Sequence, residues 1–181
     1  MERIAAADIA GGFDHTIFKS SLYGSVVTFC HNDQLFEIGA HLRGEYPRVV
    51  ACGWQKTNPT PFANKNYKAD VEPYIHAWRP GFHPQGAPAD LSRIITTPVI
   101  KSPYDHPTVK PDLVMNKILK NVNGETVVDP FMGTGSTGLA ALRHGKKFVG
   151  IEKNPAFFNI ACQRFFALYG DGVKMPDTVG L

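Results

Sequence analysis

Apolar positions recur along the chain with two different periods, which predict strands and helices in turn. Residues 25–30, SVVTFC, are the first run rich in β-branched residues, and residues 48–54, RVVACGW, are the second. Between them Leu35, Ile38 and Leu42 share the spacing of one helix face, and Asn32 is the expected N-cap. Two strands joined by a helix predict a βαβ crossover and hence a parallel sheet.

The second half of the chain repeats this pattern around a glycine-rich turn. A short β-branched run at residues 127–128 stops at Asp129, and the sequence GTGSTG follows at residues 133–138. An apolar helical run comes next, and a second strand at residues 147–151 is followed directly by Glu152. The predicted unit is therefore strand, turn, helix, strand and acid.

Three further helices are predicted. One covers about residues 16–22, and the last covers about residues 155–169. The third begins near Pro111, because proline suits a first helical turn. Its apolar face is formed by Leu113, Val114, Ile118 and Leu119.

Prolines crowd residues 55–104, so this segment is expected to be rich in loops. It holds or adjoins several basic and aromatic residues that could meet phosphates and stack on bases. They are Lys56, Lys65, Lys68, Arg79, Trp54, Tyr67 and Trp78. For each residue taken singly, the simpler interpretation is a core aromatic or a solvated charge.

Composition and charge limit the class of protein. The chain has 181 residues, of which 43% are hydrophobic and 19% charged, so one globular domain is expected over residues 1–181. Its longest apolar stretches fall short of the roughly 20 residues that span a bilayer, which predicts a cytoplasmic protein. The net charge of +3 is compatible with DNA binding without requiring it.

The cysteines and histidines indicate no metal site. The 3 cysteines lie far apart and form no CxxC, and the 7 histidines show no HExxH spacing. The cysteines are interpreted as small buried side chains.

The glycine turn and the following acid predict a nucleotide-like ligand. Glycines let the backbone approach such a ligand closely, and Glu152 at the end of the next strand can accept both hydroxyls of a ribose. A dinucleotide and S-adenosylmethionine both suit this arrangement. The turn lacks GxGxxG, however, and Asp129 beside it would repel a pyrophosphate, so an NAD-dependent enzyme is the less favoured alternative.

Two motifs resemble those of a known family. DPFMGTGST at residues 129–137, with IE at residues 151–152, resembles the S-adenosylmethionine site of the DNA amino-methyltransferases, which methylate adenine N6 or cytosine N4. HPTVKP at residues 106–111 resembles the segment that closes over the methionine end of the cofactor in that family. Their order is similar to the β group, in which the catalytic half precedes the cofactor half. A plain βαβ unit without this cofactor is the alternative.

The resemblance implies an α/β fold of the Rossmann-like, S-adenosylmethionine-dependent methyltransferase type. The sheet would be mostly parallel and flanked by helices, and the order of its elements would be circularly permuted. Within a single domain, residues 1–54 would be a remnant of the catalytic half and residues 55–104 a segment that could face DNA. Residues 105–169 would then form the cofactor half.

The resemblance also implies a set of cofactor-binding residues from three segments. Those before the helix at Pro111 would flank the amino-acid moiety, those of the turn would surround the methionine and adenosyl groups, and those after the second strand would hold the ribose and adenine. The set is Thr108, Lys110 and Pro111; Asp129, Phe131, Gly133, Gly135 and Thr137; Glu152 and Asn154. Thr137 would also help to start the helix, and Lys110 would pair with the methionine carboxylate.

The catalytic signature of the family is absent from its expected place. In the family, an acid or amide, two prolines and an aromatic, as in DPPY, would precede residue 8. They stack the flipped base and accept the two N–H bonds of its amino group. NPTPF at residues 58–62 and SPY at residues 102–104 only imitate this motif. The catalytic residues therefore stay unknown.

The expected function is that of an S-adenosylmethionine-dependent, site-specific DNA methyltransferase acting on an exocyclic amino group, in a short or N-terminally truncated form. Because the central catalytic strand would be missing, a partner chain or second protomer could complete the sheet. The alternative is a catalytically inactive cofactor-binding or DNA-binding module whose partner chain carries the catalytic motif. The choice of adenine or cytosine and membership of a restriction system stay open.

Overall fold

The computed structural model describes residues 13–59, 61, 67–100 and 109–170. The chain divides into two compact units, and each has its own sheet. Unit 1 comprises residues 1–101 and 120–124, and unit 2 comprises residues 102–119 and 125–181. The single methyltransferase domain with a circularly permuted order stays a prediction.

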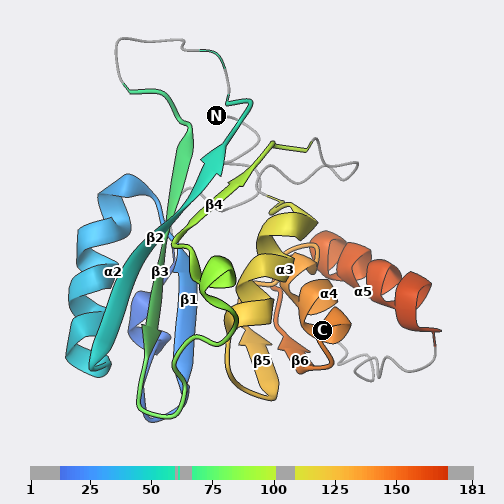
Figure 1. Ribbon diagram of the computed structural model, residues 1–181. Helices are drawn as coiled ribbons and strands as arrows, with labels where there is room; N and C mark the ends of the chain where they lie inside the picture. The colour runs from blue at the N-terminus through green and yellow to red at the C-terminus, as the bar shows by residue number, and fades with distance from the viewer. Residues whose placement is uncertain (1–12, 60, 62–66, 101–108, 171–181) are drawn as a thin grey trace. The chain divides into compact units, whose positions relative to one another are not determined.

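Unit 1 is built on a four-stranded sheet (Figure 1). In spatial order its strands are β1 (Ser25–Phe29), β3 (Val71–Trp78), β2 (Arg48–Lys56) and β4 (Ile94–Thr97). β3 is antiparallel to β1 and β2, whereas β4 is parallel to β2. The predicted strands β1 and β2 therefore run in the same direction, but they are not neighbours, because β3 lies between them.

Sequence analysis missed β3 because of Pro73, which argues against a central strand. The structure shows why this proline is tolerated. β1 pairs with β3 only as far as Phe29 opposite Tyr74, and the carbonyl of Pro73 accepts a hydrogen bond from the Cys30 N–H at 3.2 Å. Since the N and O of one strand residue face the same side, the ring nitrogen of Pro73 lies beyond the end of β1, where no donor is required.

Helix α2 (Asn32–Glu45) lies along one face of this sheet (Figure 1). Its N-cap is His31, one residue earlier than expected. The His31 side chain accepts a hydrogen bond from the Asp33 N–H at 3.4 Å, and the His31 N–H donates to Gln34 Oε1 at 3.3 Å. This reciprocal pair is a capping box, with an imidazole in place of the usual hydroxyl.

The core of unit 1 lies between α2 and the sheet. The expected helix face is confirmed, since Ile38 and Leu42 are buried and Leu35 packs against them. The core cluster consists of Phe18, Val26, Cys30, Ile38, Leu42, Tyr46, Ile75 and Ala77. The helix expected at residues 16–22 is only the 3₁₀ turn η1 (His15–Ile17).

The segment expected to be loop-rich carries more regular structure than predicted. Besides β3, it contains the 3₁₀ turn η2 (Pro88–Leu91) and β4. Trp54 anchors this part of the sheet, because its buried Nε1 donates to Thr97 Oγ1 at 2.8 Å. β4 escaped prediction because four residues are too few to establish a period.

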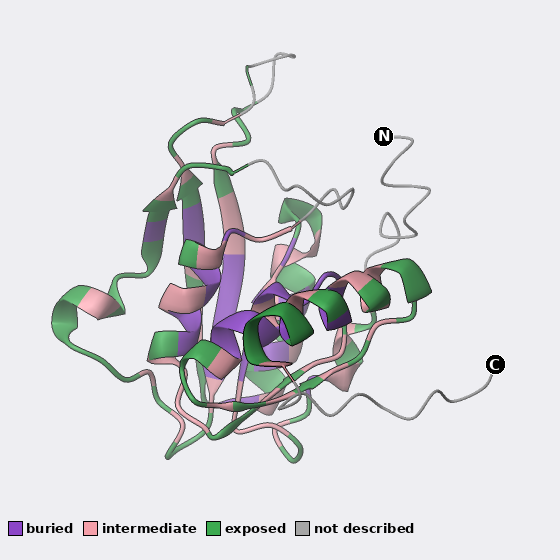
Figure 2. Ribbon diagram, turned by 90° about the vertical axis from the view of Figure 1, so that its right-hand side faces the viewer, coloured by how far each residue is buried: buried purple, intermediate pink, exposed green. Residues whose placement is uncertain are grey.

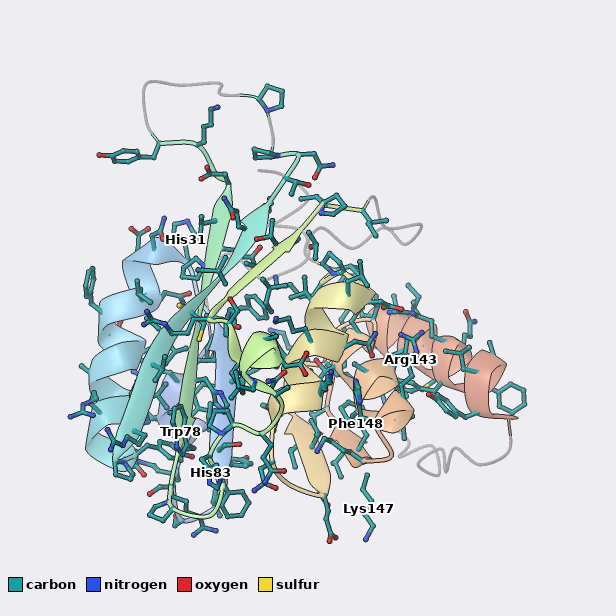
Figure 3. All side chains as sticks on the ribbon, viewed as in Figure 1. His31, Trp78, His83, Arg143, Lys147 and Phe148 are labelled. Atoms are coloured by element: carbon teal, nitrogen blue, oxygen red, sulfur yellow. The ribbon has the colours of Figure 1, made fainter. Side chains whose placement is uncertain are left out.

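Unit 2 contains a two-stranded parallel sheet with helices on one face. Its elements are α3 (Asp112–Asn121, whose last two residues belong to unit 1), β5 (Thr126–Asp129), α4 (Ser136–Arg143), β6 (Lys147–Gly150) and α5 (Pro155–Tyr169). The core joins Leu139 of α4 to Ala161 and Phe165 of α5, and Phe148 of β6 packs against them (Figure 3). The outward residues of α5 are exposed (Figure 2).

The other face of the β5–β6 pair is exposed. Val128 lies opposite Val149 in the register, and their exposed fractions are 38% and 50%. Ile151 follows on the same side and is 57% exposed. Parallel sheets are ordinarily covered on both faces, so this face is incomplete within unit 2.

In α3 the predicted apolar face is right at three positions and wrong at one. Val114, Ile118 and Leu119 are buried, whereas Leu113 is 58% exposed. The neighbours of Leu113 one helical turn later are Asn116 and Lys117, so its side of the helix is polar. Met115 takes its place in the core.

Candidate cofactor site

The glycine-rich turn is tied to the carboxyl ends of β5 and β6 by backbone hydrogen bonds. Asp129 Oδ1 accepts the Phe131 N–H at 3.0 Å, and the Met132 N–H donates to the carbonyl of Ile151 at 3.0 Å. The Ile151 N–H donates in turn to the carbonyl of Asp129 at 2.9 Å, and the Gly135 N–H donates to that of Met132 at 2.8 Å. The turn therefore has a defined shape that its own chain maintains.

Gly133 and Gly135 both have positive φ, at 53° and 84°. At Gly135 a second constraint applies, because a Cβ would lie 2.8 Å from Phe165 Cζ and 3.1 Å from Ala161 Cβ. Sequence analysis attributed these glycines to the approach of a ligand. At Gly135 the close neighbour is instead helix α5 of the same unit.

Glu152 is placed where the sequence predicted an acid, at the carboxyl end of β6 and two residues after Gly150. Its Oε2 accepts the Gly133 N–H at 2.9 Å, and its Oε1 accepts the Asn154 N–H at 2.8 Å. Each carboxylate oxygen has a further acceptor position. Glu152 therefore holds the turn in place and still has the capacity to accept two ligand hydroxyls, a double role that the sequence did not reveal.

Asn154 serves as the N-cap of α5. Its Oδ1 accepts the N–H groups of Ala156 at 2.9 Å and Phe157 at 3.4 Å. Capping thus occupies the side-chain oxygen, so any contact with an adenine would involve the Nδ2 group. The predicted adenine contact stays a prediction.

Asp129 lies in a buried environment at the end of β5. Burial raises the pKa of its carboxyl group, and the charge of Glu152 acts in the same direction. Hydrogen bonds from the Thr137 side chain and the Phe131 N–H oppose this shift. A ligand with a positive charge would stabilise these two carboxylates, whereas a phosphate would be repelled.

Thr137 lies in the first turn of α4, as expected, but it is not the cap of that helix. Gly135 is the N-cap and makes no side-chain hydrogen bond. The Thr137 side chain is hydrogen-bonded to Asp129 instead. The exposed ring of Phe131, at 52%, is the large apolar group of the turn.

The segment before α3 belongs to the same unit as the turn. Pro111 is buried, and its carbonyl accepts the N–H groups of Val114 at 3.0 Å and Met115 at 3.2 Å, which confirms its place at the helix start. Lys110 is half-buried. Thr108 lies outside the described residues.

Two charged residues have contacts that the sequence did not reveal, Arg164 with the turn and Asp112 with the arginines of unit 2. Arg164 donates from Nη1 to the carbonyl of Thr134 at 2.6 Å, and Asp112 lies 2.8 Å from Arg143, labelled in Figure 3. The sequence did contain a signal that Arg164 has a partner inside the protein. It is the single charged residue of α5 and stands next to the core residue Phe165.

Several candidates for DNA contact have structural partners in unit 1. Trp54 is buried, and Lys56 lies over its ring at 5.1 Å while pairing with Glu72 at 3.3 Å. Arg79 lies 5.1 Å from the centre of the Phe82 ring. For these residues the simpler interpretation applies.

The remaining candidates differ in exposure. Tyr67 is fully exposed and Lys68 is exposed, whereas Trp78 lies against the ring of His76 at 5.0 Å. Lys65 lies outside the described residues. Asn58, in the NPTPF string, bonds to both the N–H and the carbonyl of Val99, at 2.6 and 3.1 Å, so it has a structural task.

A family model described as DNA methylase matches residues 24–163. The chain is 29% identical over 153 residues to the type II methyltransferase M2.LlaDCHI of Lactococcus lactis subsp. cremoris, covering 74% of this chain and 56% of the relative. It is also 29% identical over 156 residues to M2.DpnII of Streptococcus pneumoniae, covering 76% of this chain and 58% of the relative. The chain thus spans little more than half the length of these relatives.

A solved structure gives the same result. The crystal structure of the M1.HpyAVI–SAM complex is 30% identical, covers 78% of this chain and 74% of its own, and superimposes with a TM-score of 0.65. The predicted α/β methyltransferase fold is thereby confirmed. With the glycine turn and the acid that follows β6, these matches show that the chain belongs to the DNA methylase family of N6 and N4 amino-methyltransferases.

Proposed function

We propose that the chain binds S-adenosylmethionine and serves in the methylation of an exocyclic amino group of DNA, adenine N6 or cytosine N4. The observation that carries this proposal is the carboxylate of Glu152, held by the N–H groups of Gly133 and Asn154. Both of its oxygens retain acceptor capacity beside the glycine turn, which suits the two neighbouring hydroxyls of a ribose.

The hydrogen bonds of the turn favour S-adenosylmethionine over a dinucleotide. A pyrophosphate requires N–H groups that point at it. Here the N–H groups of Phe131, Met132, Gly133 and Gly135 already donate within the protein. The two carboxylates beside them suit a ligand that carries a sulfonium and an ammonium group.

The remaining predicted residues have chemically suitable roles around this ligand. Glu152 would hold the ribose, Lys110 would pair with the methionine carboxylate, and Asp129 would face the positive groups. Phe131 offers an apolar surface. Bound S-adenosylmethionine supplies an activated methyl group, and these residues would orient it and retain it at the turn. The groups that accept the N–H bonds of the target base are not assigned to any described residue.

The DNA partner would meet the chain at unit 1. The connection between β2 and β3 carries Tyr67 and Lys68, both exposed, and a base can stack on such a ring while the lysine meets a phosphate. The DNA substrate in turn implies a cytoplasmic location. In the described part of the chain, no helix is long and apolar enough to cross a membrane.

A further polypeptide segment is also proposed as a partner. It would come from a partner chain or a second protomer and would complete the sheet. This inference is supported by the exposed face at Val128 and Val149 and by β1, whose outer edge pairs with no described strand.

Calorimetric titration with S-adenosylmethionine tests the cofactor assignment. We expect the wild-type chain to bind and Glu152→Ala to lose at least about tenfold in affinity, because hydrogen bonds to a charged group contribute about 1.5–3 kcal/mol each. Glu125→Ala removes an exposed acid just before β5 and is the matched control. NADH should not bind. A folded wild-type chain that fails to bind S-adenosylmethionine would overturn the proposal.

A further inference from the structure

Arg164 is buried on α5 and directed at the glycine turn. Its side chain is only 13% exposed. Nη1 donates to the carbonyl of Thr134 at 2.6 Å and lies 3.3 Å from Thr134 Oγ1 and 3.5 Å from Ser136 Oγ. Both Thr134 and Ser136 are themselves buried, so the guanidinium is an internal hydrogen-bond donor for the turn.

The same guanidinium reaches the first residue of α3. Its Nη2 lies 3.9 Å from Asp112 Oδ1, and the other oxygen of Asp112 accepts from Arg143 Nη1 at 2.8 Å. Asp112 directly follows Lys110 and Pro111 in the sequence. Arg164 therefore contacts the turn and the residue next to Pro111, which belong to two of the three chain segments of the proposed cofactor site or adjoin them.

Two adjacent residues of the turn are thus held from opposite directions. Glu152 accepts the N–H of Gly133, and Arg164 donates to the carbonyl of Thr134. These bonds fix the two peptide units that flank the one joining Gly133 to Thr134. The planar fork of arginine can serve a carbonyl and a carboxylate at once, which a lysine ammonium cannot do with the same geometry.

We propose that Arg164 is a positioning residue for the cofactor site, with Asp112 as the group that orients it. Arg164 would fix the glycine turn relative to the Lys110–Asp112 segment, so that Glu152 and Lys110 can bind the two ends of one ligand. The inference rests on the proposed function, because it takes that ligand to be S-adenosylmethionine.

Fold stability alone does not account for this arrangement. A buried ion pair is often no more stabilising than apolar residues of similar volume. The guanidinium also lies beside Ser136, at the start of α4, where the helix dipole disfavours a positive charge. The arginine donates a hydrogen bond to the turn at a fixed angle, which an apolar side chain could not do.

The test compares Arg164→Met and Arg164→Lys with Arg143→Met. Arg143 pairs with the same carboxylate, and among the described residues its side chain is bonded to Asp112 and not to the turn, so it is the matched control. Calorimetry gives the affinity for S-adenosylmethionine. Hydrogen exchange of the amides of residues 131–136 in the cofactor-free protein reports the turn itself, and denaturant unfolding reports overall stability.

We expect Arg164→Met to bind at least about tenfold more weakly, Arg164→Lys to give an intermediate loss, and Arg143→Met to stay within about twofold of wild type. Amide exchange in residues 131–136 should be faster in Arg164→Met than its loss of overall stability explains. Ile118→Val, which shortens a buried side chain of α3, supplies the comparison at reduced stability.

Different outcomes separate the two proposals. If wild type binds and Arg164→Met binds equally well, the positioning role is overturned and the cofactor assignment stands. If the folded wild type does not bind, the proposed function fails. In that case the exchange rates of the turn amides test the positioning role of Arg164 without a ligand. Equal exchange rates in Arg164→Met and Arg143→Met would overturn that role.

Discussion

Asp129 combines a stability cost with a binding role. Because burial raises its pKa, the unfolded chain releases the proton at lower pH than the folded chain does. The contribution of this group to stability is therefore largest below its unfolded pKa of 3.8 and is lost as the pH rises through the folded value. At neutral pH the ionised Asp129 destabilises the fold.

We expect Asp129→Asn to raise the free energy of unfolding at pH 7 and to weaken binding of the positively charged cofactor. Asparagine retains an oxygen that can accept the Phe131 N–H but carries no charge. Denaturant unfolding and calorimetry on the same preparations measure the two effects. A variant that is less stable and binds with unchanged affinity would contradict this account.

His76 makes the stability of unit 1 sensitive to acid. The side chain is 8% exposed, its Nε2 finds no hydrogen-bond partner among the described residues, and burial lowers its pKa from 6.5 to about 4. Stability is therefore intact above about pH 6.5 and falls as the pH drops towards about 4, because the unfolded chain takes up the proton first.

We expect His76→Leu to remove this part of the pH dependence between about pH 6.5 and 4. Both tryptophans, Trp54 and Trp78, lie in unit 1, so their fluorescence reports its unfolding selectively. His83→Leu, at an exposed position in the same unit, is the control. An identical pH profile in wild type and His76→Leu would show that other groups cause the acid sensitivity.

At the residue scale, the sequence predicted the acid and the turn but not how they are joined. Glu152 could be identified because strand ends and acids are visible in the sequence. Its bonds to Gly133 and Asn154 depend on two strands lying side by side, which no local pattern reveals. Arg164 was missed for the same reason, since its partner Thr134 lies 30 positions away.

At the scale of elements, the contact between α4 and α5 is governed by glycines. A Cβ at Gly135 would overlap Phe165, and its φ of 84° is unfavourable for other residues. Gly145 also has a positive φ, 67°, but nothing lies within 4 Å of its Cβ position. Substitution at Gly145 therefore measures the destabilisation from backbone strain alone, whereas substitution at Gly135 adds the destabilisation from steric overlap.

We expect Gly145→Ala to cost about 1 kcal/mol of stability, from backbone strain alone. Gly135→Ala should cost about 2–4 kcal/mol, because the overlap with α5 is added. Chemical denaturation of both variants measures the difference. Phe165→Leu in the Gly135→Ala background should recover part of the loss, and equal costs at the two glycines would exclude the packing explanation.

Elements with a clear period were predictable, whereas those set by distant contacts were not. The face of α2 and the βαβ unit around Gly135 have the expected periods and were confirmed. β3 was missed because Pro73 is acceptable only where β1 has already ended. Leu113 was wrongly assigned to the buried face because it is apolar, although its neighbours on that side of the helix are polar.

At the scale of the whole molecule, the lack of a central strand that the sequence suggested stays a prediction. The described strands form two separate sheets, β1–β3–β2–β4 and β5–β6, with no strand hydrogen bond between them. The sequence did not reveal the antiparallel insertion of β3, which makes the larger sheet mixed. Strand order depends on pairing over long distances, so a local period cannot predict it.

We expect the 181-residue chain to bind S-adenosylmethionine without methylating DNA by itself. Asn58 is engaged with Val99, and Asp129 belongs to the cofactor turn, so neither is available to accept the N–H bonds of a target base. Transfer of a labelled methyl group to DNA, measured with and without a polypeptide that supplies a DPPY motif, tests this. Methylation by the chain alone would contradict it.

The hydrogen bonds within the glycine turn have a thermodynamic consequence. Since Glu152 holds Gly133 and Asn154 by hydrogen bonds within the protein, little backbone freedom remains to be lost on association. Binding should therefore carry a small conformational entropy penalty and proceed in one kinetic phase without a slow rearrangement. Differences in affinity among cofactor analogues would then arise mainly in their dissociation rates.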